Sequence, residues 1–190
     1  MGHANRVAGE RSFGVVKMDS RTNRLLQRDD TQFGGRPDEA SNLKPIGWLK
    51  SLETGNVKID SEHRALVAQC DALSRFVTDL PPQGFGIAVA ELKSAMASHF
   101  VSEAKVLLST GFERVHARRR EHKKILAQME ELLVKAERAK NMAEHTEIVR
   151  AIRNLLIETM IRHDLDFKSH LEFVAEYPLV AARGRRRNQA

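Results

Sequence analysis

The chain has 190 residues, of which 42% are hydrophobic and 29% charged, and its formal net charge is +6. This length provides the core of one ordinary globular domain with additional tails. No stretch approaches the roughly 20 apolar residues of a membrane span, and residues 1–14 contain no apolar block of the signal-peptide kind. The single cysteine, Cys70, excludes an internal disulfide. We therefore expect a cytoplasmic protein in which Cys70 is a small buried residue.

Part of the positive charge lies in two clusters. The first comprises residues 118–120 with Lys123 and Lys124, and the second comprises Arg183 with residues 185–187. Such clusters can bind nucleic acid or anionic surfaces. Here no aromatic residues lie between the basic ones, and no nucleic-acid-binding motif is present. We interpret the clusters as a solvated helix face and a basic tail, and expect no nucleic-acid binding.

The sequence divides into three parts. Residues 1–44 are polar and show no persistent period, which predicts a mostly disordered tail with one short helix near residues 21–27. Order is expected from residue 45, so the domain covers residues 45–178. Residues 179–190 form the basic tail.

Within this domain, apolar residues recur at steps of three and four in four successive segments. The predicted helices cover about residues 60–79, 85–110, 113–140 and 143–176. Prolines or a glycine follow three of these segments and favour helix termination. No strand pattern is present. Four long amphipathic helices with short connections predict an all-α, up-down-up-down antiparallel four-helix bundle.

Ionisable side chains interrupt the apolar faces of all four predicted helices. They are His63, His99, Glu103, His122 and Asp164. An ionisable group in a bundle core is unfavourable unless it is paired or bound to a metal. Three imidazoles and two carboxylates predict a site for iron, zinc or manganese. The alternative is a metal-free polar network in which the histidines donate to the carboxylates.

Several motifs in this region resemble those of a hemerythrin domain of the bacteriohemerythrin kind. Residues 99–103, HFVSE, resemble the HFxxE signature of the family's second helix. Residues 59–63, IDSEH, resemble the start of its first helix, and residues 111–112 resemble the Gly-Tyr turn before its third. Residues 164–167, DLDF, resemble the end of its fourth-helix motif. The resemblance covers about residues 46–177 and implies an iron cofactor.

Hemerythrins hold two irons through five histidines and two bridging carboxylates. The resemblance places His63, His99, Glu103 and Asp164 at ligand positions, and His122 at the second position of the third-helix HxxxH pair.

Two family ligands are missing. Arg118 stands at the first position of the HxxxH pair, and Thr159 replaces the fourth-helix histidine. Both changes fall on the iron held by the third and fourth helices. His163, one turn after Thr159, is the alternative ligand. A register that starts from His163 would place Lys168 at the carboxylate position, so we prefer the register with Asp164.

These losses suggest a single iron held by His63, His99, Glu103 and Asp164. Two histidines with carboxylates form a common non-haem iron(II) set. The guanidinium of Arg118 would then replace the charge of the lost iron by pairing with Glu103 or Asp164. The alternative is that Arg118 points to solvent.

The remaining histidines on the predicted helices, His116, His145 and His170, are expected at the surface or at helix ends.

The sequence thus predicts a hemerythrin-like non-haem iron protein that binds or senses dioxygen, nitric oxide or iron, with one of its two iron sites impaired. It would hold one or two irons per chain, or zinc. No nucleophile–base pair, P-loop or dinucleotide fingerprint indicates an ordinary enzyme, although redox chemistry at a single iron stays open. The alternative is a metal-free or zinc-bearing interaction module in a signalling pathway, which binds a protein partner or self-associates.

Overall fold

The computed structural model describes residues 43–75, 77 and 82–178, without the side chains of residues 82, 83 and 163–165. The short helix predicted near residues 21–27 and the basic tail lie outside this part. Within the described ranges the chain is helical and contains no strand. None of the described helices combines the length and the apolar character needed to cross a lipid bilayer.

In the described part of the chain, a short 3-10 helix precedes five α-helices and one π-helix. In chain order the elements are η2 (Lys50–Leu52), α2 (Val57–Arg75), α3 (Pro82–Thr110), α4 (Val115–Arg138), α5 (Met142–Glu158), the π-helix η3 (Thr159–Asp164) and α6 (Leu165–Glu176). The first three predicted helices correspond to α2, α3 and α4. The fourth corresponds to α5, η3 and α6 in succession, and the π turn inside it was not predicted.

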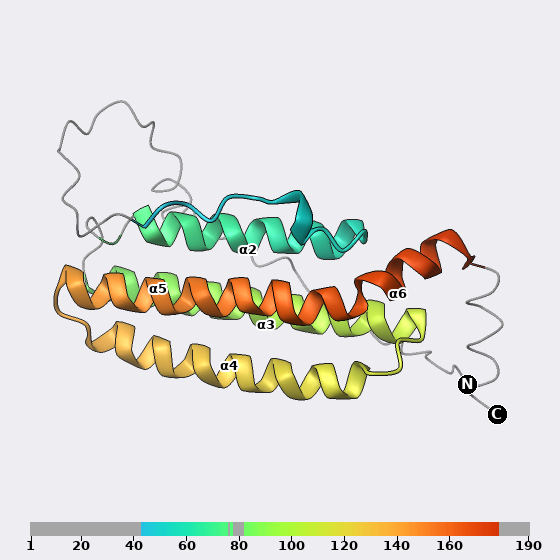
Figure 1. The fold of residues 1–190 in the computed structure, drawn as a ribbon. Coiled ribbons are helices and arrows are strands. Elements are labelled where there is room, and N and C mark those ends of the chain that lie inside the picture. Colours follow the sequence, from blue (N-terminus) through green and yellow to red (C-terminus); the bar gives the residue numbers. More distant parts are fainter. Residues whose placement is uncertain (1–42, 76, 78–81, 179–190) are drawn as a thin grey trace, which may run out of the picture. The chain divides into compact units, whose positions relative to one another are not determined.

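Each of the four long helices contacts two of the others, so that together they form a closed set. Helix α3 contacts α2 and α4, and α5 contacts the same two helices. Figure 1 shows α2, α3, α4 and α5 lying alongside one another, while the chain bends where α5 passes into α6. Each long helix therefore turns one face toward a shared interior.

The turn after α3 explains how the chain enters α4. Gly111 has φ 77°, a left-handed conformation that favours glycine. The amide of Phe112 donates to the carbonyl of Leu107 (2.9 Å), and that of Gly111 donates to Leu108 (3.2 Å). This pattern is a Schellman motif, which satisfies the last carbonyls of α3. Leu107 and Phe112 also pack in the same apolar cluster.

Two buried aspartates fix α2 against the segment that precedes it. Asp60 accepts hydrogen bonds from the amide and hydroxyl of Thr54 (2.7 and 2.8 Å). Asp71 accepts from the amides of Ile46 (2.7 Å) and Gly47 (3.1 Å). These bonds satisfy backbone donors that have no helical partner. They set the rotation of α2, and with it the direction of the side chains one turn further along.

The core contains two apolar clusters. The larger one includes Cys70, which is fully buried as predicted, and burial raises the pKa of its thiol to about 12. The smaller one consists of Ile59, Leu107, Phe112, Val115, Phe167 and Leu171. On α2, His63 lies between Ile59 of the smaller cluster and Leu66 of the larger one. The other helices repeat this order, so a polar layer separates the two clusters.

Candidate metal centre

The polar layer contains four of the five predicted ligand residues, together with Arg118. His63 comes from α2, His99 and Glu103 from α3, and Arg118 and His122 from α4; each is at most 5% exposed. The side chain of the fifth predicted ligand, Asp164, lies outside the described residues.

Three of these side chains have the spacing of a metal site. The Nε2 atoms of His63 and His99 are 3.1 Å apart, and His99 Nε2 is 3.5 Å from Oε2 of Glu103. The ligand atoms of the three residues all lie within 4.8 Å of one another. With metal–nitrogen bonds of about 2.0–2.1 Å, neighbouring ligand atoms around one ion lie about 2.9–3.4 Å apart. The His63–His99 separation falls within this range and the His99–Glu103 separation is close to it, so the three residues form a group that could hold one ion.

The protonation states also suit a cation. Burial, followed by the nearby His99, lowers the pKa of His63 from 6.5 to about 3, so its imidazole is neutral at neutral pH. Burial likewise lowers the pKa of His122. Burial alone would raise the pKa of Glu103, but the adjacent rings of His122 and His99 and the charge of Arg118 hold it well below its usual value. The layer thus combines neutral imidazoles with an ionised carboxylate, as a metal site requires.

Arg118 pairs with Glu103 in the interior. Its Nε donates to Oε1 of Glu103 (2.8 Å) and its Nη2 to Oε2 (3.4 Å). The expected pairing is confirmed, and the solvent-facing alternative for Arg118 is wrong. The guanidinium also lies over the ring of Phe167, 5.5 Å from its centroid. This buried two-point contact compensates the charge of Glu103.

His122 lies on the Arg118 side of Glu103. Its Nε2 is 3.3 Å from Oε1 of Glu103, and its ring stacks on Phe100 with centroids 3.9 Å apart. The cluster of three ligand atoms does not include His122. The structure therefore brings His122 to the shared carboxylate but not to the pair of His63 and His99.

Comparison with protein families matches residues 54–176 to the hemerythrin HHE cation-binding domain. The chain belongs to this family. The match confirms the resemblance inferred from the motifs, and the family description agrees with a buried cluster of histidine and carboxylate ligands. A comparison with curated proteins gave no match.

In this hemerythrin domain, Thr159 does not act as a free donor. It is buried, and its hydroxyl donates to the carbonyl of Leu155 on its own helix (2.7 Å). Thr159 and Asp164 are the first and last residues of the π-helix, whose hydrogen bonds link residues five apart. The side chains of Asp164 and His163 lie outside the described residues, so their ligand roles stay predictions.

Glu62 supports the ligand cluster but was not predicted from the sequence. Its Oε2 is 3.0 Å from Nδ1 of His99, and its Oε1 is 2.9 Å from Nζ of Lys58. Burial would raise the pKa of Glu62, but its contacts with His99 and Lys58 lower it to about 2. The ionised carboxylate therefore accepts the Nδ1 proton of His99 and leaves the lone pair on Nε2 for a metal. Its position directly before His63 in the IDSEH motif was the available signal.

Of the three histidines expected at the surface or at helix ends, His145 lies in the first turn of α5, at a helix end, whereas His170 lies within α6. His145 is buried, and its ring stacks on Phe85 with centroids 4.1 Å apart. His170 is half-buried and packs against Phe112. His116 is exposed, as expected.

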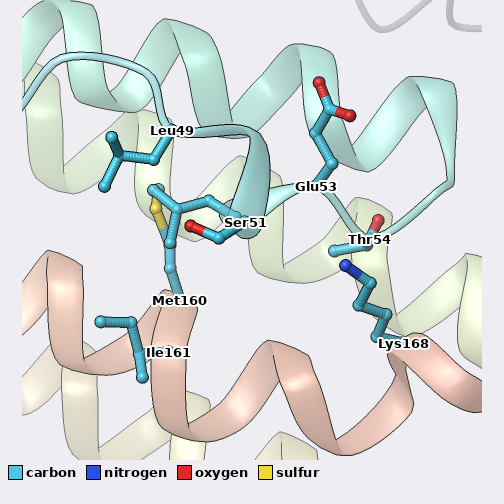
Figure 2. Close-up of a pocket in the computed structure, with 8 residues that line it drawn as sticks. Leu49, Ser51, Glu53, Thr54, Met160, Ile161 and Lys168 are labelled. Atoms are coloured by element: carbon cyan, nitrogen blue, oxygen red, sulfur yellow. The ribbon is translucent and has the colours of Figure 1, made fainter.

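A recess of about 210 Å³ borders the π-helix on the side of the segment before α2. Its lining is mostly apolar and includes Leu49, Leu52, Met160 and Ile161. Figure 2 shows Met160 directed toward Leu49 and Ser51, and Lys168 extending from α6 toward Thr54. His63, His99 and Glu103 do not line this recess. It is therefore distinct from the ligand cluster of the hemerythrin site.

Proposed function

We propose that this protein is a hemerythrin-like iron-binding protein with one principal metal position. His63, His99 and Glu103 would hold the ion, and Asp164 would complete the set. The main support for this proposal is the spacing of the three described ligands. The Nε2 atoms of His63 and His99 lie 3.1 Å apart in a buried layer. Imidazole with carboxylate suits iron(II), with zinc as the alternative metal.

The fold supports this proposal. We infer that α2, α3, α4 and the segment from α5 to α6 form an antiparallel up-down-up-down bundle, because each long helix contacts two others in a closed set. Ligands from facing helices of such a bundle converge on its axis. The apolar clusters on both sides of the polar layer limit the access of water to it.

For the bound ion we propose a small diatomic ligand, dioxygen or nitric oxide, in a sensing role. Iron(II) with two histidines and carboxylates offers open coordination positions for such a ligand. The chain itself supplies neutral imidazoles, a fixed tautomer at His99 and a buried carboxylate. We propose a cytoplasmic binding protein that acts through another protein or through self-association, rather than an ordinary enzyme.

The test is the metal content of protein purified anaerobically from iron-supplemented cells. Elemental analysis should give about one iron per chain for the wild type and none for the His63→Ala/His99→Ala variant. The matched control is His116→Ala, because His116 is exposed and its loss should leave the iron content unchanged. Nitric oxide added to the iron(II) protein should produce an absorption band that the double variant lacks.

A wild-type protein without metal would overturn this proposal. It would favour the interaction module, for which the compensation of Glu103 by Arg118 provides a stable metal-free core. Partner binding should then survive the loss of both His63 and His99.

A further inference from the structure

The carboxylate of Glu103 lies between two groups of nitrogen atoms. Oε2 lies 3.5 Å from Nε2 of His99 and 3.4 Å from Nη2 of Arg118. Oε1 lies 2.8 Å from Nε of Arg118 and 3.3 Å from Nε2 of His122. A carboxylate in this arrangement can serve two cations at once. The imidazoles of His99 and the neighbouring His63 can ligate a metal. Arg118, in contrast, already places a cation beside the carboxylate.

Arg118 is a permanent occupant of the second position. A guanidinium stays protonated in proteins, so it has no lone pair for a metal and repels a second cation. The side chain is buried, contacts both oxygens of Glu103 and covers the ring of Phe167. Removing it from this position would break a buried ion pair, which is strongly unfavourable.

We propose that Arg118 is a built-in cation that occupies one of the two cation positions of Glu103 and limits the protein to a single metal ion. This inference rests on the proposed metal binding. In the metal-free protein, Arg118 also balances the charge of Glu103. Folding should then depend little on metal, and the ion can leave without exposing an uncompensated carboxylate.

The first test counts bound ions. Metal-free protein is titrated with zinc, which needs no control of redox state, and calorimetry gives the number of ions per chain. We expect one ion for the wild type and two for Arg118→His/Thr159→His, which provides imidazoles beside His122. The matched control is Arg119→His/Thr159→His, because residue 119 is exposed on α4; it should stay at one.

The outcomes separate this inference from the proposed function. Two ions in the wild type would overturn the single-ion limit and leave metal binding intact. A folded Arg118→His/Thr159→His variant that still binds one ion would also overturn it. A wild type that binds no ion would overturn the proposed function, and the single-ion limit with it.

The second test does not depend on creating a new site. Arg118→Met keeps an unbranched apolar stem but removes the guanidinium and its charge, whereas Arg118→Lys keeps the charge and loses the two-point contact. Melting temperatures are measured with and without zinc. Arg118→Met should melt lower than the wild type when metal-free, and zinc should raise its melting temperature more than it raises that of the wild type. Arg118→Lys should lie between them. Equal zinc-induced shifts in Arg118→Met and the wild type would contradict the role of Arg118 as a substitute cation.

Discussion

The Nδ1 atom of His99 lies 3.0 Å from a carboxylate oxygen of Glu62. Because this contact fixes the ring orientation and the tautomer of His99, it should control how well the opposite nitrogen binds a metal. We expect Glu62→Gln to weaken zinc or iron(II) affinity by about 10- to 100-fold, the usual cost of losing such a partner. Competition with a chelator of known affinity measures the change.

The matched control for this prediction is Lys58→Met. Lys58 pairs with the same carboxylate of Glu62 but is exposed, so its removal should change metal affinity much less. If both variants bind metal as the wild type does, Glu62 does not position His99.

The stability of the metal-free protein should decrease as the pH is lowered below about 6.5. Because the pKa of His63 is lowered from 6.5 to about 3 in the fold, the unfolded chain takes up a proton at His63 before the folded one does. Above pH 6.5 His63 therefore does not reduce the free energy of unfolding. Between pH 6.5 and about 3 the reduction grows as the pH falls. Each pH unit costs up to about 1.4 kcal/mol.

Urea unfolding at pH 6.5, 5.5 and 4.5 tests this dependence. His63→Leu should flatten the profile in part, since the pKa of His122 is also lowered. His116→Leu, at an exposed position, should leave the profile unchanged. A His63→Leu profile as steep as that of the wild type would exclude a neutral buried His63.

Asp71 should be important for stability because it accepts hydrogen bonds from two backbone amides, those of Ile46 and Gly47. Asp71→Ala leaves these donors without their acceptor, which should reduce the free energy of unfolding by about 1–3 kcal/mol. Asp166→Ala is the control, because Asp166 forms a surface pair with Arg114 and should cost less than about 1 kcal/mol. Urea denaturation measures both, and equal losses would argue against the anchoring role.

Cys70 should be unreactive in the folded protein. Burial raises the pKa of its thiol to about 12, and the thiolate is the reactive form. A disulfide reagent at pH 8 should therefore modify Cys70 only after unfolding in urea. Ser94→Cys, which adds a thiol at an exposed position of α3, should react at once in the native protein. Rapid modification of native wild-type protein would contradict the burial of Cys70.

The helices and most of the polar layer could be predicted from the sequence because both depend on local periodicity. A histidine in an apolar seam faces the interior wherever the helix packs, so His63, His99 and His122 could be placed without coordinates. The pairing of Arg118 with Glu103 or Asp164 was one of two alternatives, favoured by the cost of burying an unpaired carboxylate. The structure decides for Glu103.

Other features depend on information that periodicity does not contain. Glu62 lies beside the seam of α2 rather than in it, and only the approach of α3 brings it to His99. His145 lies in the first turn of α5, so its expected place at a helix end agrees with the structure. It also precedes Ile148 by three residues and Val149 by four, so the periodicity of α5 was enough to indicate that it is buried. The recess next to Met160 requires the segment before α2 to pack against η3 and α6, which is a long-range contact.

The π turn at Thr159–Asp164 has a consequence for the tolerance of the chain to changes in length. A π turn holds one residue more than an α-helical turn. Deleting one residue there would restore α-helical hydrogen bonding and keep Phe167 facing its cluster. Deleting one residue within α5 would instead rotate everything that follows by about 100°. The turn is thus the place where the last helical segment can shorten by one residue and keep its apolar face toward the core.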